Sequence, residues 1–78
     1  MSLFAQKHGP EYKILSQRLR EAREAARLSQ AEAAIRVGKP QSFISKCESG
    51  ERRLDIIELT VLAELYGKDL SFFDVRSA

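Results

Sequence analysis

The sequence is poor in the residues that cross-link small secreted proteins or bind metals. It has one cysteine among 78 residues, so no internal disulfide can form and a reducing cytoplasm is the expected location. Its single histidine, His8, and its single cysteine, Cys47, are too few for a metal cluster at the usual ligand counts. We therefore expect no metal and no cofactor, and we interpret Cys47 as a small core residue.

The patterns of membrane proteins and of enzymes are absent as well. No apolar run approaches the length of a membrane span, and the N-terminus lacks a signal-peptide pattern. There is no glycine-rich phosphate loop and no pair of acidic residues on a shared face, so we do not expect an enzyme. Residues 1–10 show no periodicity and end in Gly9-Pro10, which indicates a flexible arm before one folded domain at 11–78.

Charge is unevenly distributed along the chain, although the formal net charge is only +2. Residues 1–35 carry six Lys and Arg against four Asp and Glu, residues 36–53 carry five against two, and residues 54–78 carry two against five. The basic excess therefore peaks in the middle of the chain. This gradient favours a protein with one DNA-facing end, although an ordinary solvated surface would also explain it.

Hydrophobic periodicity predicts an all-α protein, and no β alternation or internal repeat competes with it. The first stripe, expected on a helix at about 11–27, consists of Tyr12, Leu15, Leu19, Ala22 and Ala26. Further helices are expected at about 30–37 and 41–49, then between Asp55 and Gly67, with a short fifth helix or turn at 70–75. Asp55 and Glu58 have the spacing of a capping box at the start of the fourth helix. All-helical packing suits the small core that a chain of this length can build.

Capping residues define two short helices joined by a tight turn. Ser29 and Glu32 have the spacing of a capping box, which begins a helix. Gly38 can adopt the left-handed backbone that ends this helix, and Pro40 suits the first turn of the next one. Two helices joined in this way form a helix-turn-helix unit, whose second helix enters the DNA major groove.

These residues give the chain a resemblance to the Cro/repressor-type helix-turn-helix family, also called the XRE family, over about residues 11–73. It is carried by Leu28-Ser29-Gln30, Ala34, Gly38, Ile44-Ser45, Glu48 and Gly50, followed by a leucine-rich fourth helix. The resemblance implies a compact five-helix, lambda-repressor-like DNA-binding domain that acts as a homodimer on two-fold operators. Lys39-Pro40 departs from the family, which often has Ser or Thr here, so no hydroxyl contact with phosphate is carried over.

Four polar residues share one face of the helix expected at 41–49. If Ile44 and Cys47 face the core, the opposite face presents Gln41, Ser42, Ser45 and Lys46. Gln suits a bidentate contact with adenine and Lys a contact with guanine, and the resemblance implies base reading at positions 41, 42 and 46. Any surface helix has a polar outer face, so these residues indicate DNA only together with the surrounding motif. Phe43, beside them, could contact a thymine methyl, but packing is the favoured interpretation.

Phosphate contacts are expected on both sides of this helix. Gln30 opens the preceding helix, where backbone N–H groups and the helix dipole favour an anion, and the resembled family uses the matched glutamine on phosphate. Lys39, Arg52 and Arg53 flank the reading helix and would position the protein without reading sequence. Gln30 could instead merely complete the helix N-terminus, and Arg52 could pair with Glu48, four residues earlier.

Arg23 and Glu48 both fall on the inward edge of their helices, where a charge needs a partner. The simplest solution is that the two side chains pair, and the resembled family pairs the matched residues. We expect a structural ion pair here.

Large apolar residues crowd the end of the chain. The segment holds Leu70, Phe72, Phe73 and Val75. The core can use Leu70 and one phenylalanine, so we expect the others to form an exposed dimer interface.

The sequence therefore predicts a homodimeric regulator that binds double-stranded DNA, such as a restriction–modification controller, a phage-type repressor or an antitoxin-like autoregulator. The alternative is a protein-interaction module on the same scaffold, with DNA binding secondary. Its protein partner would be unknown, and neither interpretation involves a membrane.

Overall fold

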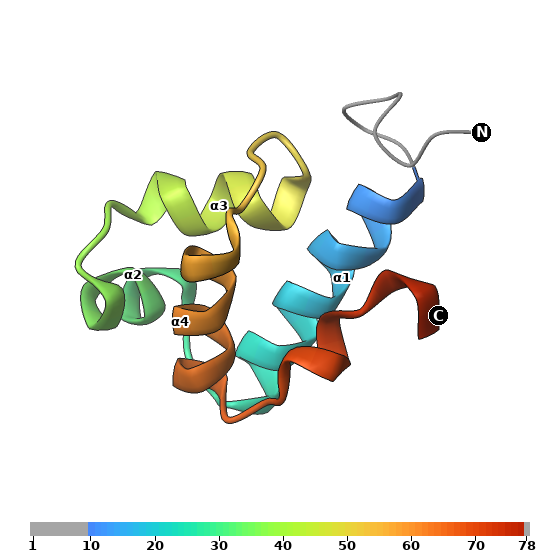
Figure 1. Ribbon diagram of the computed structural model, residues 1–78. Coiled ribbons are helices and arrows are strands. Elements are labelled where there is room, and N and C mark those ends of the chain that lie inside the picture. The colour runs from blue at the N-terminus through green and yellow to red at the C-terminus, as the bar shows by residue number, and fades with distance from the viewer. Residues whose placement is uncertain (1–9, 78) are drawn as a thin grey trace.

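The computed structural model describes residues 10–77, which form four α-helices followed by two short 3₁₀ turns (Figure 1). The helices are α1 (Pro10–Ala25), α2 (Gln30–Val37), α3 (Gln41–Ser49) and α4 (Ile56–Tyr66), and the turns are η1 (Leu70–Phe73) and η2 (Val75–Ser77). Pro10, expected in the arm, is the first residue of α1. The rest of that expected arm, residues 1–9, lies outside the described residues.

Both predicted capping boxes are present, and they explain where α2 and α4 begin. Ser29 Oγ accepts from the Glu32 N–H at 3.0 Å, and Glu32 Oε1 accepts from the Ser29 N–H at 2.8 Å. In the second box, Asp55 Oδ1 accepts from the Glu58 N–H at 2.7 Å, and Glu58 Oε1 accepts from the Asp55 N–H at 3.1 Å. Gly38 ends α2 with φ of +70°, in the left-handed region that glycine adopts without strain. These local bonds satisfy backbone groups that a short helix would otherwise leave unpaired.

α1 ends two residues earlier than the apolar stripe predicts. Arg27 has φ of +60°, a left-handed backbone that is uncommon outside glycine. The reversal lets the Arg27 N–H donate to Glu24 O at 2.9 Å and the Leu28 N–H donate to Arg23 O at 3.2 Å. The stripe continues through Ala26, but this turn has already redirected the chain toward α2.

The core lies where α3 meets α1 and α2, with α4 packed against α1 and α2. Ala22 of α1 and Ala33 of α2 have no exposed surface, and their small side chains let the helices approach closely. Ile44 and Leu62, each at most 2% exposed, are the largest of the fully buried side chains. The remaining buried apolar residues are Leu19, Ala34, Phe43, Cys47, Ala63, Tyr66 and Phe73.

The segment at 70–75, expected as a short fifth helix or turn, forms the turns η1 and η2. Asp74 between them has ψ of 107°, an extended conformation that interrupts any helix. Four and three residues are lengths at which 3₁₀ turns commonly occur. The domain is thus a compact all-α fold with four helices in its described part, rather than a five-helix bundle.

One phenylalanine of residues 70–75 enters the core, as expected, but Leu70, also expected in the core, is exposed. Phe73 is 3% exposed and belongs to the core, and Phe72 packs edge-on against it at 5.1 Å. Lys68 and Arg18 lie over the Phe72 ring, and Arg18 Nη1 donates to Phe72 O at 2.6 Å. Val75 is half-buried, and only Leu70 keeps a large exposed fraction, 42%. The segment packs on α1 and α4, and Leu70 is its one large apolar side chain with a large exposed fraction among the described residues.

Candidate nucleic-acid interface

α3 lies across one end of the molecule, with α2 and α4 on its inner side (Figure 1). Ile44 and Cys47 are buried, as are Phe43 and Glu48. Burial raises the pKa of the Cys47 thiol to about 11, so this cysteine stays neutral and unreactive. The residues expected to read bases, Gln41, Ser42, Ser45 and Lys46, are all exposed on the outward side of α3. The helix therefore presents a continuous polar face away from the core.

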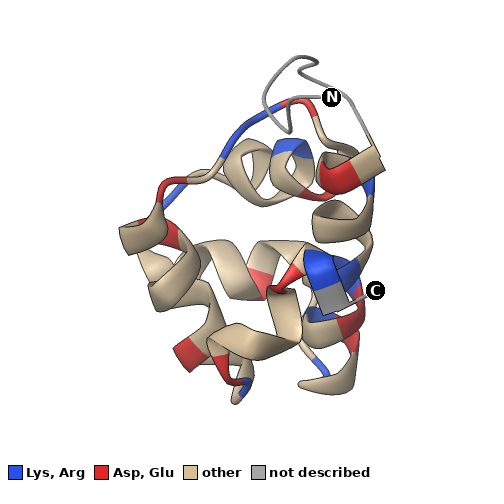
Figure 2. Cartoon of the chain, turned by 45° about the vertical axis from the view of Figure 1, so that its right-hand side comes forward, with Lys and Arg blue, Asp and Glu red and all other residues tan. Residues whose placement is uncertain are grey.

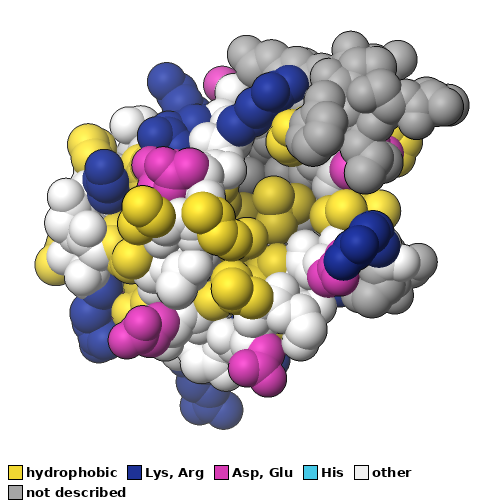
Figure 3. Space-filling view, viewed as in Figure 1, with side chains coloured by type: hydrophobic (Ala, Val, Ile, Leu, Met, Phe, Trp, Pro, Cys, Tyr) yellow, Lys and Arg dark blue, Asp and Glu magenta, His cyan; other side chains and the backbone are white. Residues whose placement is uncertain are grey.

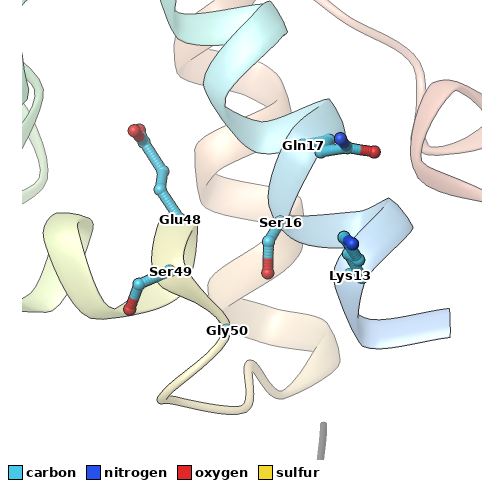
Figure 4. Close-up of a pocket in the computed structure, with 6 residues that line it drawn as sticks. All are labelled: Lys13, Ser16, Gln17, Glu48, Ser49 and Gly50. Atoms are coloured by element: carbon cyan, nitrogen blue, oxygen red, sulfur yellow. The ribbon is translucent and has the colours of Figure 1, made fainter. Parts of the chain in front are cut away.

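The C-terminal end of α3 is held close to α1. Gly50 ends the helix with φ of +82°, and a Cβ at this position would lie 3.4 Å from Ser16 Oγ. Figure 4 shows Ser16 of α1 near Gly50, beside a cavity of about 330 Å³ that Lys13 and Gln17 also line. Gly50 thus allows both the turn of the backbone and the close approach of α3 to α1, and together these fix the position of α3 on α1.

A buried ion pair links α3 to α1. Arg23 Nε donates to Glu48 Oε2 at 2.7 Å, and Arg23 Nη2 donates to Glu48 Oε1 at 3.0 Å. The Glu48 side chain is 2% exposed and the Arg23 side chain 11% exposed. The bond to Glu48 raises the pKa of Arg23. Arg23 Nη1 also donates to Leu28 O at 2.8 Å, so one guanidinium joins α1, α3 and the chain entering α2.

The buried carboxylate is connected to the polar face by two glutamines. Gln30 Nε2 donates to Glu48 Oε1 at 3.1 Å, and Gln41 Nε2 donates to Gln30 Oε1 in a long bond of 3.5 Å. The Gln30 amide nitrogen keeps a second N–H, which a phosphate could accept. Gln30 therefore does not merely complete the N-terminus of α2. It also contacts Gln41, the first residue of the exposed polar face of α3.

Arg52 is held by an acidic residue that the sequence interpretation assigned only to capping. Its guanidinium donates to Glu58 at 2.9 and 3.0 Å, and it lies 4.7 Å from the centre of the Phe43 ring. This bidentate bond lowers the pKa of Glu58 and raises that of Arg52. The alternative pairing of Arg52 with Glu48 does not occur, because Glu48 points into the core toward Arg23.

The other two cations expected at phosphates also lie over aromatic rings. Lys39 Nζ is 5.5 Å from the centre of the Phe43 ring, and the Arg53 guanidinium is 5.0 Å from that of Tyr12. Phe43 is 8% exposed and packs beneath Lys39 and Arg52, which agrees with the favoured interpretation of its role. Lys39 and Arg53 make no ion pair within residues 10–77, so their charge is available to an anion.

The α3–α4 loop is less basic than its arginines suggest. Figure 2 shows its basic positions flanked by acidic ones, which the sequence identifies as Glu51 and Asp55. Together with the Arg52–Glu58 pair, these carboxylates offset part of the loop's positive charge. Glu58 follows Arg52 by six residues in the sequence. This spacing spans a loop, which has no fixed geometry, so it could not predict that the two side chains pair.

Two short helices joined by a glycine turn, the second carrying an exposed polar face over a buried apolar one, define a helix-turn-helix protein. A protein-family model described as a helix-turn-helix domain matches residues 14–71, so the chain belongs to that family, within the XRE/Cro-like group. The family binds DNA and is not enzymatic. A comparison with curated proteins finds no match.

Two further features of the described residues bear on the kind of site. Among residues 10–77, no three His, Cys, Asp or Glu side chains gather in a way that could hold a metal ion. Over the same range, none of the helices has the length and apolar character that crossing a membrane requires.

Proposed function

We propose that this protein is a transcriptional regulator that binds a two-fold operator as a homodimer and reads the major groove with α3. The supporting observation is the exposed set Gln41, Ser42, Ser45 and Lys46 on the outward face of α3, the second helix of the helix-turn-helix unit. Gln41 would read adenine and Lys46 guanine. One short helix contacts few base pairs, so a second copy supplies the remaining specificity.

Phosphate contacts would come from four places around this face. Gln30 has a free N–H at the start of α2, where the helix dipole favours an anion. Lys39 and Arg53 are exposed cations without a carboxylate partner among the described residues. Arg52 would contribute less, because a phosphate must compete with Glu58 for it.

Selection of bound sequences from a random duplex pool tests this function most broadly. We expect an enriched site with two related halves, one helical turn apart between centres, because two copies of α3 would enter successive major grooves. Binding should weaken steeply with salt. No enrichment and no shift of duplex DNA at low salt would contradict the proposal and favour a protein-interaction module.

A further inference from the structure

The outward face of α4 is apolar, although it lies opposite the core. Ile57 is 72% exposed and Val61 is 46% exposed, and residues four apart form one stripe on a helix. On the opposite side, Leu62 and Tyr66 are buried. Thr60 and Glu64 are also exposed on α4, but the aliphatic strip formed by Ile57 and Val61 is suited to being covered.

The stripe borders a groove between α2 and α4. One part, of about 210 Å³, is lined by Val37, Phe43, Ile57 and Val61, among others. The groove continues past Val37 and Val61 to Arg36, Glu64 and Leu65. Figure 3 shows hydrophobic side chains gathering on this face of the molecule. We call this surface the α2–α4 groove.

The rim of the α2–α4 groove carries charges of both signs. Lys39 and Glu58 line the part of the groove nearer α3, where Glu58 is already paired with Arg52. Arg36 lies on the α2 side and Glu64 on the α4 side, and both are exposed. Within residues 10–77 neither side chain forms a hydrogen bond or an ion pair. An apolar strip with a cation on one side and a carboxylate on the other is complementary to a copy of itself, because a two-fold axis along the strip sets opposite charges face to face.

We propose that a second copy of this chain covers the α2–α4 groove. The two-fold axis runs along α4, the two α4 helices pack side by side in parallel, and Arg36 of each copy pairs with Glu64 of the other. α4 runs away from the end of the molecule where α3 lies (Figure 1), so this axis keeps both α3 helices at the same end. The inference rests on the proposed homodimeric function and places its interface on α4, instead of on residues 70–75.

Sedimentation without DNA tests the interface directly. Wild type should dimerise between about 1 and 200 µM, and Val61→Glu should raise the dimer dissociation constant at least ~10-fold. Ile35→Glu is the matched control: Ile35 is 79% exposed on α2 but does not line the groove, so this variant should dimerise like wild type. Thermal unfolding of each variant checks that it is folded. A monomeric wild type, or a Val61→Glu variant that dimerises normally, overturns the proposal.

Charge exchange gives a second, independent readout. Arg36→Glu and Glu64→Arg should each weaken dimerisation, since each sets like charges together, and the double exchange should restore it. If both single variants dimerised weakly and the double variant dimerised no better, the pairing of Arg36 with Glu64 would be contradicted. The two proposals fail in different ways. If only the interface proposal is wrong, the protein still binds duplex DNA as a monomer. If only the DNA-binding proposal is wrong, the protein dimerises but does not bind duplex DNA.

Discussion

Gln41, the first residue of α3, donates a hydrogen bond to Gln30, whose own amide donates to the buried carboxylate of Glu48. Glu48 is in turn fixed by Arg23 of α1. A side chain expected to touch a base is thus linked by two hydrogen bonds to an ion pair between α1 and α3. Long polar side chains on a surface usually lose conformational entropy when they bind, and this chain of contacts restricts Gln41 beforehand.

The first prediction concerns the Arg23–Glu48 pair. Each single alanine variant should lose about 2–4 kcal/mol of unfolding free energy, because it removes the bidentate partner of a mostly buried charge. Arg20, 3.6 Å from Glu48, and Gln30 replace the Arg23 contacts only in part. The double variant should cost less than the two losses added. Urea unfolding of the four proteins in a double-mutant cycle measures this coupling, and additive losses would show that the two side chains do not interact.

The second prediction concerns the competition for Arg52. Glu58→Gln removes the carboxylate that holds this guanidinium, so affinity for random duplex DNA should rise and the salt slope should steepen by about 0.9, one additional phosphate contact. Arg52→Ala should change the slope by less than Arg53→Ala. Binding titrations at several salt concentrations give the slopes. An unchanged slope in Glu58→Gln would mean that Arg52 already contacts phosphate in the wild type.

The same pair predicts how stability depends on pH. Hydrogen bonding from Arg52 lowers the pKa of Glu58 in the folded protein, so this group adds stability above its unfolded pKa and loses it as the pH falls through its folded pKa. Wild type should therefore lose stability more steeply than Glu58→Gln as the pH falls below about 4.5. Denaturant unfolding between neutral and acidic pH compares the two proteins. Parallel curves would contradict a native-state role for the pair.

The fourth prediction concerns the left-handed backbone at Arg27. Arg27→Gly should stabilise the protein by ~1 kcal/mol, because glycine adopts a positive φ without the steric cost of a Cβ. Arg27→Ala is the control: it removes the charge, keeps the Cβ and should give no such gain. Thermal unfolding measures both variants. Equal stability of the glycine and alanine variants would show that no strain is released at this position.

The helix-turn-helix unit and its polar face could be predicted because their signals are local. A capping box, a glycine turn and a proline each act within a few residues, so the bounds of α2 and α3 agree with the sequence prediction. The exposed set on α3 follows from helical periodicity once Ile44 and Cys47 are assigned inward.

The missed features depend on contacts that no local pattern encodes. Residues 70–75 lack helical periodicity, so the sequence could not tell which phenylalanine enters the core; Phe73 does, and Phe72 is covered by Arg18 and Lys68. The Arg52–Glu58 pair spans a loop, and Arg52 also lies over the Phe43 ring, a contact between residues that no helical spacing relates. The sequence could not predict that Ile57 and Val61 are exposed, because an apolar position does not reveal whether its own core or a partner covers it.

Base reading by α3 is tested most directly by the ratio of affinities for a selected operator and for random duplex DNA. Gln41→Ala and Lys46→Ala should each lose ~1–3 kcal/mol on the operator and little on random DNA, so the ratio should fall about 5- to 150-fold. Ile35→Ala, an exposed change away from α3, is the control and should leave the ratio unchanged. If both α3 variants kept the wild-type ratio while remaining folded, α3 would not be the element that reads sequence.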